Sequence, residues 1–111
     1  MMDITPEKLK SEMEKESPMV IVDLQEARLY QHNHIPGAIN IPMDGFQAEY
    51  PALLKDKDLP TVVTGEFDEL GKGSKAGEIL EAAGYTKVGH IVGGLMAWRN
   101  AGYPTESGVE S

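Results

Sequence analysis

The segment Met19-Val20-Ile21-Val22-Asp23 (MVIVD) decides the fold class of this chain. A continuous apolar run that ends in an acid is typical of a strand buried on both faces, because a strand with one solvated face alternates apolar and polar residues. Such strands occur in parallel sheets whose two faces are covered by helices. The segment therefore predicts an α/β domain.

A helix is predicted immediately before this strand. Thr5 is a residue type that caps helices, and Pro6 suits the first helical position because no backbone hydrogen bond is lost there. Ile4 and Leu9 stand at the two positions of a hydrophobic staple. The pair Ser17-Pro18 ends the helix, since the residue before a proline disfavours helical backbone.

The same alternation continues to the end of the chain. Further strands are expected at 38–41, 61–64 and 87–92, and helices at 26–31, 46–54 (interrupted or bent near Pro51), from about Ser74 to 83 and from 93 to about 102. This order predicts a three-layer α/β domain with a central, mainly parallel sheet and helices on both faces. The domain is expected to span residues 1–104, with residues 105–111 as a frayed polar tail.

Composition limits the possible functions. The chain has 111 residues and a net charge of -8, so its surface repels nucleic acid and anionic lipid but is compatible with a basic partner. No apolar run approaches the roughly 18 to 20 residues of a membrane span. The polar, acidic start is unlike a signal peptide, and the absence of cysteine fits a cytoplasmic protein. We therefore expect neither a nucleic-acid nor a membrane partner.

Four segments, in order, resemble motifs of the rhodanese family of single-domain sulfurtransferases. They are Val20-Ile21-Val22-Asp23-Leu24-Gln25-Glu26, His34-Ile35-Pro36-Gly37-Ala38-Ile39-Asn40-Ile41-Pro42, Val62-Val63 with Gly71-Lys72-Gly73-Ser74-Lys75-Ala76, and Gly93-Gly94-Leu95-Met96-Ala97-Trp98. The resemblance covers nearly the whole chain and implies the rhodanese fold. It also implies that His34 is structural and that Trp98 belongs to the core.

The chemistry of that family needs a cysteine that this chain lacks. The family's cysteine lies in a loop whose N–H groups, together with the following helix N-terminus, lower the thiol pKa and stabilise an anionic persulfide. A basic residue late in the loop usually binds the sulfur donor. The present chain contains no cysteine, and the thioethers of its six methionines cannot be deprotonated.

Two alignments of the loop remain open. Counting back from Gly71-Lys72-Gly73-Ser74 places Asp68 at the cysteine position, whereas counting forward from the strand places Gly65 there and gives a longer loop. The longer version, 65–69, resembles the Cys-Glu-Phe opening of rhodanese-fold cell-cycle phosphatases. Gly73 stands at the arginine position in both alignments.

The candidate site consists of residues equivalent to the active-site loop. No catalytic residue and no metal ligand is assigned among them, and Asp68 is the first choice for a carboxylate that fills the anion-binding loop from within. Lys72 and Lys75 are cations that can hold an anion, and Ser74 is expected to cap the helix. The set is Gly65, Glu66, Asp68, Glu69, Gly71, Lys72, Gly73 and Ser74.

Other chemistry-bearing residues give weaker signals. Gln25 replaces the arginine that the family resemblance leads us to expect, which alters the polar network around Asp23. His32 and His34 form a His-x-His pair, but two ligands without a third do not predict a metal site. His90 is expected to be a packed or edge histidine, and no cofactor is expected.

Three hypotheses follow. The first is a non-catalytic binding or regulatory module that takes a protein partner or a small anion at the loop. The second is an enzyme, either a sulfurtransferase that uses a partner's thiol or a phosphoryl-transfer enzyme that uses Asp68. The third is a structural remnant without a ligand. The sequence favours the first and third, because persulfide chemistry requires a nucleophilic sulfur.

Overall fold

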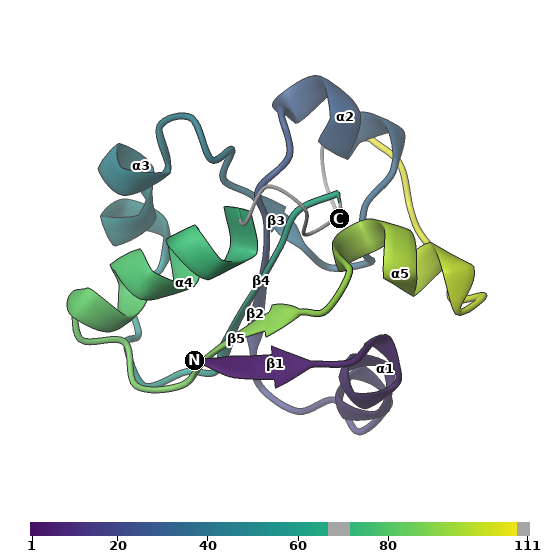
Figure 1. Ribbon diagram of the computed structural model, residues 1–111, viewed down its shortest axis with the longest axis horizontal. Helices are drawn as coiled ribbons and strands as arrows, with labels where there is room; N and C mark the ends of the chain where they lie inside the picture. Colours follow the sequence, from purple (N-terminus) through teal and green to yellow (C-terminus); the bar gives the residue numbers. More distant parts are fainter. Residues whose placement is uncertain (67–71, 109–111) are drawn as a thin grey trace.

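The computed structural model describes residues 1–66 and 72–108 (Figure 1). Its five strands form one sheet in the order β1-β5-β4-β2-β3, and every neighbouring pair is parallel. The predicted α/β class with a central parallel sheet is confirmed. The elements are β1 (Met2–Ile4), α1 (Pro6–Glu14), β2 (Val20–Asp23), α2 (Ala27–His32), β3 (Ile39–Asn40), α3 (Phe46–Leu53), β4 (Thr61–Thr64), α4 (Lys72–Ala82), β5 (Val88–Ile91) and α5 (Gly94–Asn100).

Helices cover both faces of the sheet, as Figure 1 shows. Alternate residues of each strand point to opposite faces, so β2 and β4 supply apolar side chains to two separate cores. Helices α3 and α4 pack on one face around Val22, Val63 and Phe46. Helices α1, α2 and α5 pack on the other face around Ile21 and Trp98. The apolar run that decided the fold is therefore buried from both sides.

The start of α1 has the predicted cap. Thr5 has extended backbone, and its Oγ1 accepts a hydrogen bond of 3.1 Å from the Lys8 N–H. Ile4 packs against the same core cluster as Leu9, as a hydrophobic staple requires. The helix ends at Glu14, a little before Ser17-Pro18, and Glu16 adopts a left-handed φ of 56° in the turn that follows.

Three local expectations are corrected. Strand β1 was not expected, because only Ile4 of its three residues is even partly buried and the segment has no apolar pattern. Helix α3 continues through Pro51, so of the two alternatives expected there, an interruption or a bend, the interruption is wrong. Helix α4 begins at Lys72 rather than near Ser74. A glycine such as Gly73 costs a helix only about 1 kcal/mol, and packing of the helix on the sheet can offset that cost.

The C-terminal segment is also different from the expectation. Residues 105–108 are not frayed, because Glu106 forms an isolated antiparallel bridge with His34. The Gly108 N–H additionally donates to the Gln31 carbonyl at 2.8 Å. The contacts join residues far apart in the sequence, so no local pattern indicated them.

Candidate functional site

The candidate site lies at the carboxyl edge of the sheet, where β2 and β4 end side by side. Asp23 and Thr64 are paired in the register of these two strands. Gly65 and Glu66 leave β4 at this edge, and α4 begins after the segment that follows them. Ligands of open parallel sheets bind outside the carboxyl ends of the strands. The chain therefore holds both ends of the predicted loop at the edge where such a fold binds ligands.

The described part of the predicted site comprises its two ends. Gly65 is buried, Glu66 is exposed and Gly73 is buried in the first turn of α4. Ser74 is the third residue of α4, so its predicted role as the helix cap is wrong, because the helix starts two residues earlier. Lys75 is exposed on the same helix. Asp68, Glu69 and Gly71 lie outside the described residues, and the prediction that Asp68 turns toward the helix start stays a prediction.

The opening of the loop is fixed by the first turn of α5. The first N–H groups of a helix have no partner within the helix. Here the Leu95 N–H donates to the Gly65 carbonyl at 2.9 Å, and the Met96 N–H donates to the Glu66 carbonyl at 2.8 Å. The Thr64 hydroxyl also donates to the Gly65 carbonyl, at 3.0 Å. Gly65 is thus held by contacts from two elements.

The close contact between the start of α5 and the backbone of Gly65 and Glu66 explains the Gly93-Gly94 pair. Both residues have a left-handed backbone, with φ values of 80° and 61°. A Cβ atom at Gly94 would lie 2.6 Å from the Gly65 carbonyl oxygen, which is far inside van der Waals contact. Glycine is therefore required at this position both by its backbone conformation and by the neighbouring loop.

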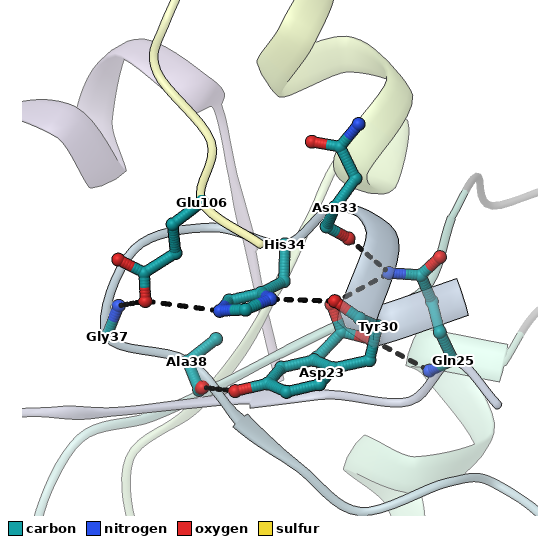
Figure 2. Close-up of polar contacts among 8 residues, drawn as sticks. All are labelled: Asp23, Gln25, Tyr30, Asn33, His34, Gly37, Ala38 and Glu106. Atoms are coloured by element: carbon teal, nitrogen blue, oxygen red, sulfur yellow. Dashed lines mark hydrogen bonds and ion pairs between the residues drawn. The ribbon is translucent and has the colours of Figure 1, made fainter. Parts of the chain in front are cut away.

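A buried carboxyl group lies beside the loop. Asp23 has no exposed side-chain surface, and its two oxygens accept hydrogen bonds from the Gln25 N–H at 2.8 Å and from Gln25 Nε2 at 2.9 Å (Figure 2). Gln25 Nε2 also donates to the Asn33 carbonyl at 3.2 Å. The family resemblance led us to expect an arginine here, and the glutamine supplies hydrogen bonds without a positive charge.

The surroundings of Asp23 raise the pKa of its carboxyl group. Burial raises the pKa of the Asp23 carboxyl from 3.8 to about 6, and the negative charge of Glu66 acts in the same direction. The hydrogen bonds from Gln25 and the interaction with His34 lower this pKa, but they do not compensate for the loss of hydration. The edge therefore carries an acid that exchanges its proton in a mildly acidic range.

The histidines do not assemble a metal centre. His32 is exposed on α2, whereas His34 is fully buried with its ring stacked on Tyr30. His90 lies in β5, inside the sheet, with its Nδ1 3.3 Å from Asp3 Oδ1 of the neighbouring β1. Within residues 1–66 and 72–108, no three His, Cys, Asp or Glu side chains are close enough to bind one ion together. No helix in that part of the chain has the length and apolar character of a membrane span.

The family is shown by comparison with known proteins. A model of the rhodanese-like domain matches residues 5–101. The chain therefore belongs to the rhodanese-like domain family, as the motifs predicted.

Individual relatives include a sulfurtransferase and a transcriptional regulator. The chain is 31% identical to the thiosulfate sulfurtransferase GlpE of Pseudomonas savastanoi, over 84% of this chain and 83% of the relative. It is 32% identical to the HTH-type transcriptional regulator Rv0324 of Mycobacterium tuberculosis, over 82% of this chain but 39% of that protein. Four of its curated relatives are much longer, and the chain spans between 23% and 54% of their length.

The fold has close structural counterparts. The crystal structure of the Alr3790 protein from Anabaena sp. superposes with a TM-score of 0.84 at 32% identity, covering 94% of this chain and 81% of that one. The thiosulfate sulfurtransferase of Pseudomonas aeruginosa superposes with a TM-score of 0.86 at 24% identity, covering 97% of this chain and 20% of that one, which supports the fold alone.

The contact between α5 and the loop can be tested with two matched glycines. Gly94 and Gly102 both have left-handed backbone, but nothing lies within 4 Å of a Cβ built at Gly102. Gly102→Ala should lower the free energy of unfolding by about 1 to 2 kcal/mol through backbone strain alone. Gly94→Ala should cost about 1 to 3 kcal/mol more, because its Cβ displaces the loop backbone. Chemical denaturation measures the free energy of unfolding of both variants. Equal losses would show that Gly94 lies farther from the Gly65 carbonyl than the structure indicates.

The raised pKa of Asp23 predicts a pH-dependent stability. Between the unfolded value near 3.8 and about 6, the folded state binds the Asp23 proton more tightly than the unfolded state. The contribution of Asp23 to the free energy of unfolding therefore falls as the pH rises through that window. The fall is at most about 3 kcal/mol, because one pKa unit corresponds to about 1.4 kcal/mol.

Asp23→Asn removes this titration, so the stability difference between the variant and the wild type should shift in the variant's favour from pH 4.5 to pH 7. Denaturation curves at both pH values measure the shift, and Asp44→Asn, at an exposed position, serves as the control. A difference that stays constant with pH would contradict the raised pKa.

Proposed function

We propose that this rhodanese-like domain is a non-catalytic binding or regulatory module rather than a sulfurtransferase. The observation that carries the proposal is the absence of cysteine from the chain. Sulfur transfer in this family proceeds through a persulfide, and no other side chain can hold one. The fold and the loop position are retained while the reacting atom is missing.

The surroundings of the loop support the same conclusion. If Gly65 is the equivalent of the cysteine, the position has no side chain, and its carbonyl accepts hydrogen bonds from Leu95 and Thr64. If Asp68 is the equivalent, a carboxylate replaces the thiolate. Gly73 supplies no cation at the arginine position. Neither alignment provides a sulfur nucleophile or the cation of the family's arginine position.

The length of the relatives supports a modular role. The chain spans 39% of a protein described as a transcriptional regulator, so a domain of this kind occurs joined to other domains. We propose that the loop edge takes a protein partner or a small anion, with the N–H groups at the start of α4 as donors. A cytoplasmic location stays part of this proposal, supported by the absence of disulfide-forming residues.

The first test is an assay of sulfur transfer from thiosulfate to cyanide. We expect the purified chain to form no thiocyanate above the uncatalysed rate, while the thiosulfate sulfurtransferase GlpE of Pseudomonas savastanoi, assayed in parallel, is active. A rate that scales with the concentration of the purified chain would contradict the proposal. A rate that appears only after a thiol-bearing partner is added would favour the alternative, a sulfurtransferase that uses a partner's thiol.

The second test asks whether the loop edge binds an anion. Amide NMR signals of Glu66, Gly73 and Ser74 should shift during a titration with thiosulfate or sulfate, and Lys72→Gln should weaken the binding. Signals of Thr86 and Lys87, which precede β5 at the opposite edge of the sheet, should not move, and Lys87→Gln is the matched control. Shifts spread evenly over the molecule would indicate a non-specific salt effect and argue against an anion site.

A further inference from the structure

Residues 103–108, here called the strap, cross the connection between α2 and β3, where Glu106 pairs with His34. In Figure 1 it is the yellow segment that leaves α5 and runs toward α2. The indole Nε1 of Trp98 donates to the Pro104 carbonyl at 2.7 Å, which fixes the start of the strap. Backbone hydrogen bonds of 3.0 and 2.9 Å join Glu106 to His34 in both directions, and the Gly108 N–H donates to Gln31.

The side chain of Glu106 meets a buried histidine. His34 has no exposed surface, and its ring stacks on Tyr30 with centroids 3.8 Å apart. Its Nδ1 lies 2.7 Å from the Tyr30 carbonyl oxygen, and its Nε2 lies 3.1 Å from Glu106 Oε2 (Figure 2). The same carboxylate oxygen is 3.5 Å from the Gly37 N–H. Besides its backbone hydrogen bonds, the strap therefore contacts the interior of the domain through a side-chain pair, Glu106 and the buried His34 ring.

The geometry places a proton between His34 and Glu106. A carbonyl oxygen can only accept a hydrogen bond, so Nδ1 carries a hydrogen in this arrangement. A neutral imidazole would then present a lone pair at Nε2 toward an ionised carboxylate, which is repulsive. A proton on this line removes the repulsion and forms a charge-assisted hydrogen bond.

We propose that His34 and Glu106 form a proton-dependent latch, which closes the strap while a proton lies between Nε2 and Oε2 and releases it when that proton is lost at higher pH. The groups that act on the His34 ring are the Tyr30 carbonyl from α2, the Glu106 carboxylate from the strap and Asp23 from β2.

The latch is linked to the candidate site by hydrogen bonds that start in the connection between α2 and β3. The carbonyl of Asn33, next to His34, accepts the amide hydrogen of Gln25, and Gln25 holds Asp23. Release of the strap frees the backbone of His34 from its bridge and so loosens the outer support of this chain of contacts. Among the described residues, the contacts of the latch involve neither Gly65 and Glu66 nor α4, so the latch can be tested without a ligand at the loop.

Two independent signals report on the latch. Trp98 is the single tryptophan of the chain, and besides its bond to Pro104 it packs on the Tyr103 ring, with centroids 5.0 Å apart. We expect its fluorescence to shift to longer wavelength in a one-proton step as the pH rises from about 5 to 8, the range in which histidine changes charge. The ¹⁵N signal of His34 Nε2 should move from its protonated to its unprotonated position with the same midpoint.

Variants of the strap separate the latch from general effects of pH. In Glu106→Gln, the amide can donate to a neutral Nε2 or accept from a protonated one, so the strap should stay closed and the fluorescence step should vanish. Glu106→Ala should give the long-wavelength signal at every pH. Ser107→Ala, at the neighbouring exposed position, should retain the wild-type step.

The outcomes that overturn the proposal are equally defined. A wild-type protein without a fluorescence step in this range would show that the pair is a static contact. A step that persists in Glu106→Gln would assign the titration to another group. Midpoints that differ between the Trp98 and His34 signals would show that the strap does not follow the proton. None of these results bears on sulfur transfer or anion binding, so this inference and the proposed function fail separately.

Discussion

The hydrogen bond between the Leu95 N–H and the Gly65 carbonyl is the constraint on which the candidate site depends. It joins the last helix, α5, to the residue that directly follows the central strand β4. Because this contact brings two backbones together, it requires a glycine at position 94 and fixes the direction in which the chain leaves the sheet. The loop position of the rhodanese-like fold is thus held by main-chain atoms, and it survives without the side chain that gives the family its chemistry.

The absence of a cation at position 25 changes the character of the same edge. Gln25 satisfies both oxygens of Asp23 by hydrogen bonding but contributes no charge, so burial determines the pKa of the acid. Neither Gln25 nor Glu66 supplies a positive charge that would stabilise a persulfide anion beside Asp23. The replacement at position 25, which follows β2, and the missing cysteine, whose equivalent position follows β4, therefore both argue against sulfur transfer.

The parts of the structure that the sequence predicted are those with local patterns. The apolar run of β2 predicted a doubly covered parallel sheet, Thr5-Pro6 predicted the start of α1, and the pair Gly93-Gly94 marked the turn before α5. The missed features depend on pairing between distant segments. Strand β1 is defined by its partner β5 rather than by its own residues, and the contact of Glu106 with His34 spans most of the chain. At the site, motifs located both ends of the loop but could not choose between its two alignments.

The two edge strands of the sheet, β1 and β3, affect how such a domain can be joined to other domains in one polypeptide. Strand β1 has three residues and strand β3 has two, so each outer edge offers very little unpaired backbone. Long exposed edges invite strand pairing between neighbouring molecules or domains, and short ones discourage it. A domain with edge strands this short can be joined to different domains during evolution with little risk that its sheet pairs with their strands.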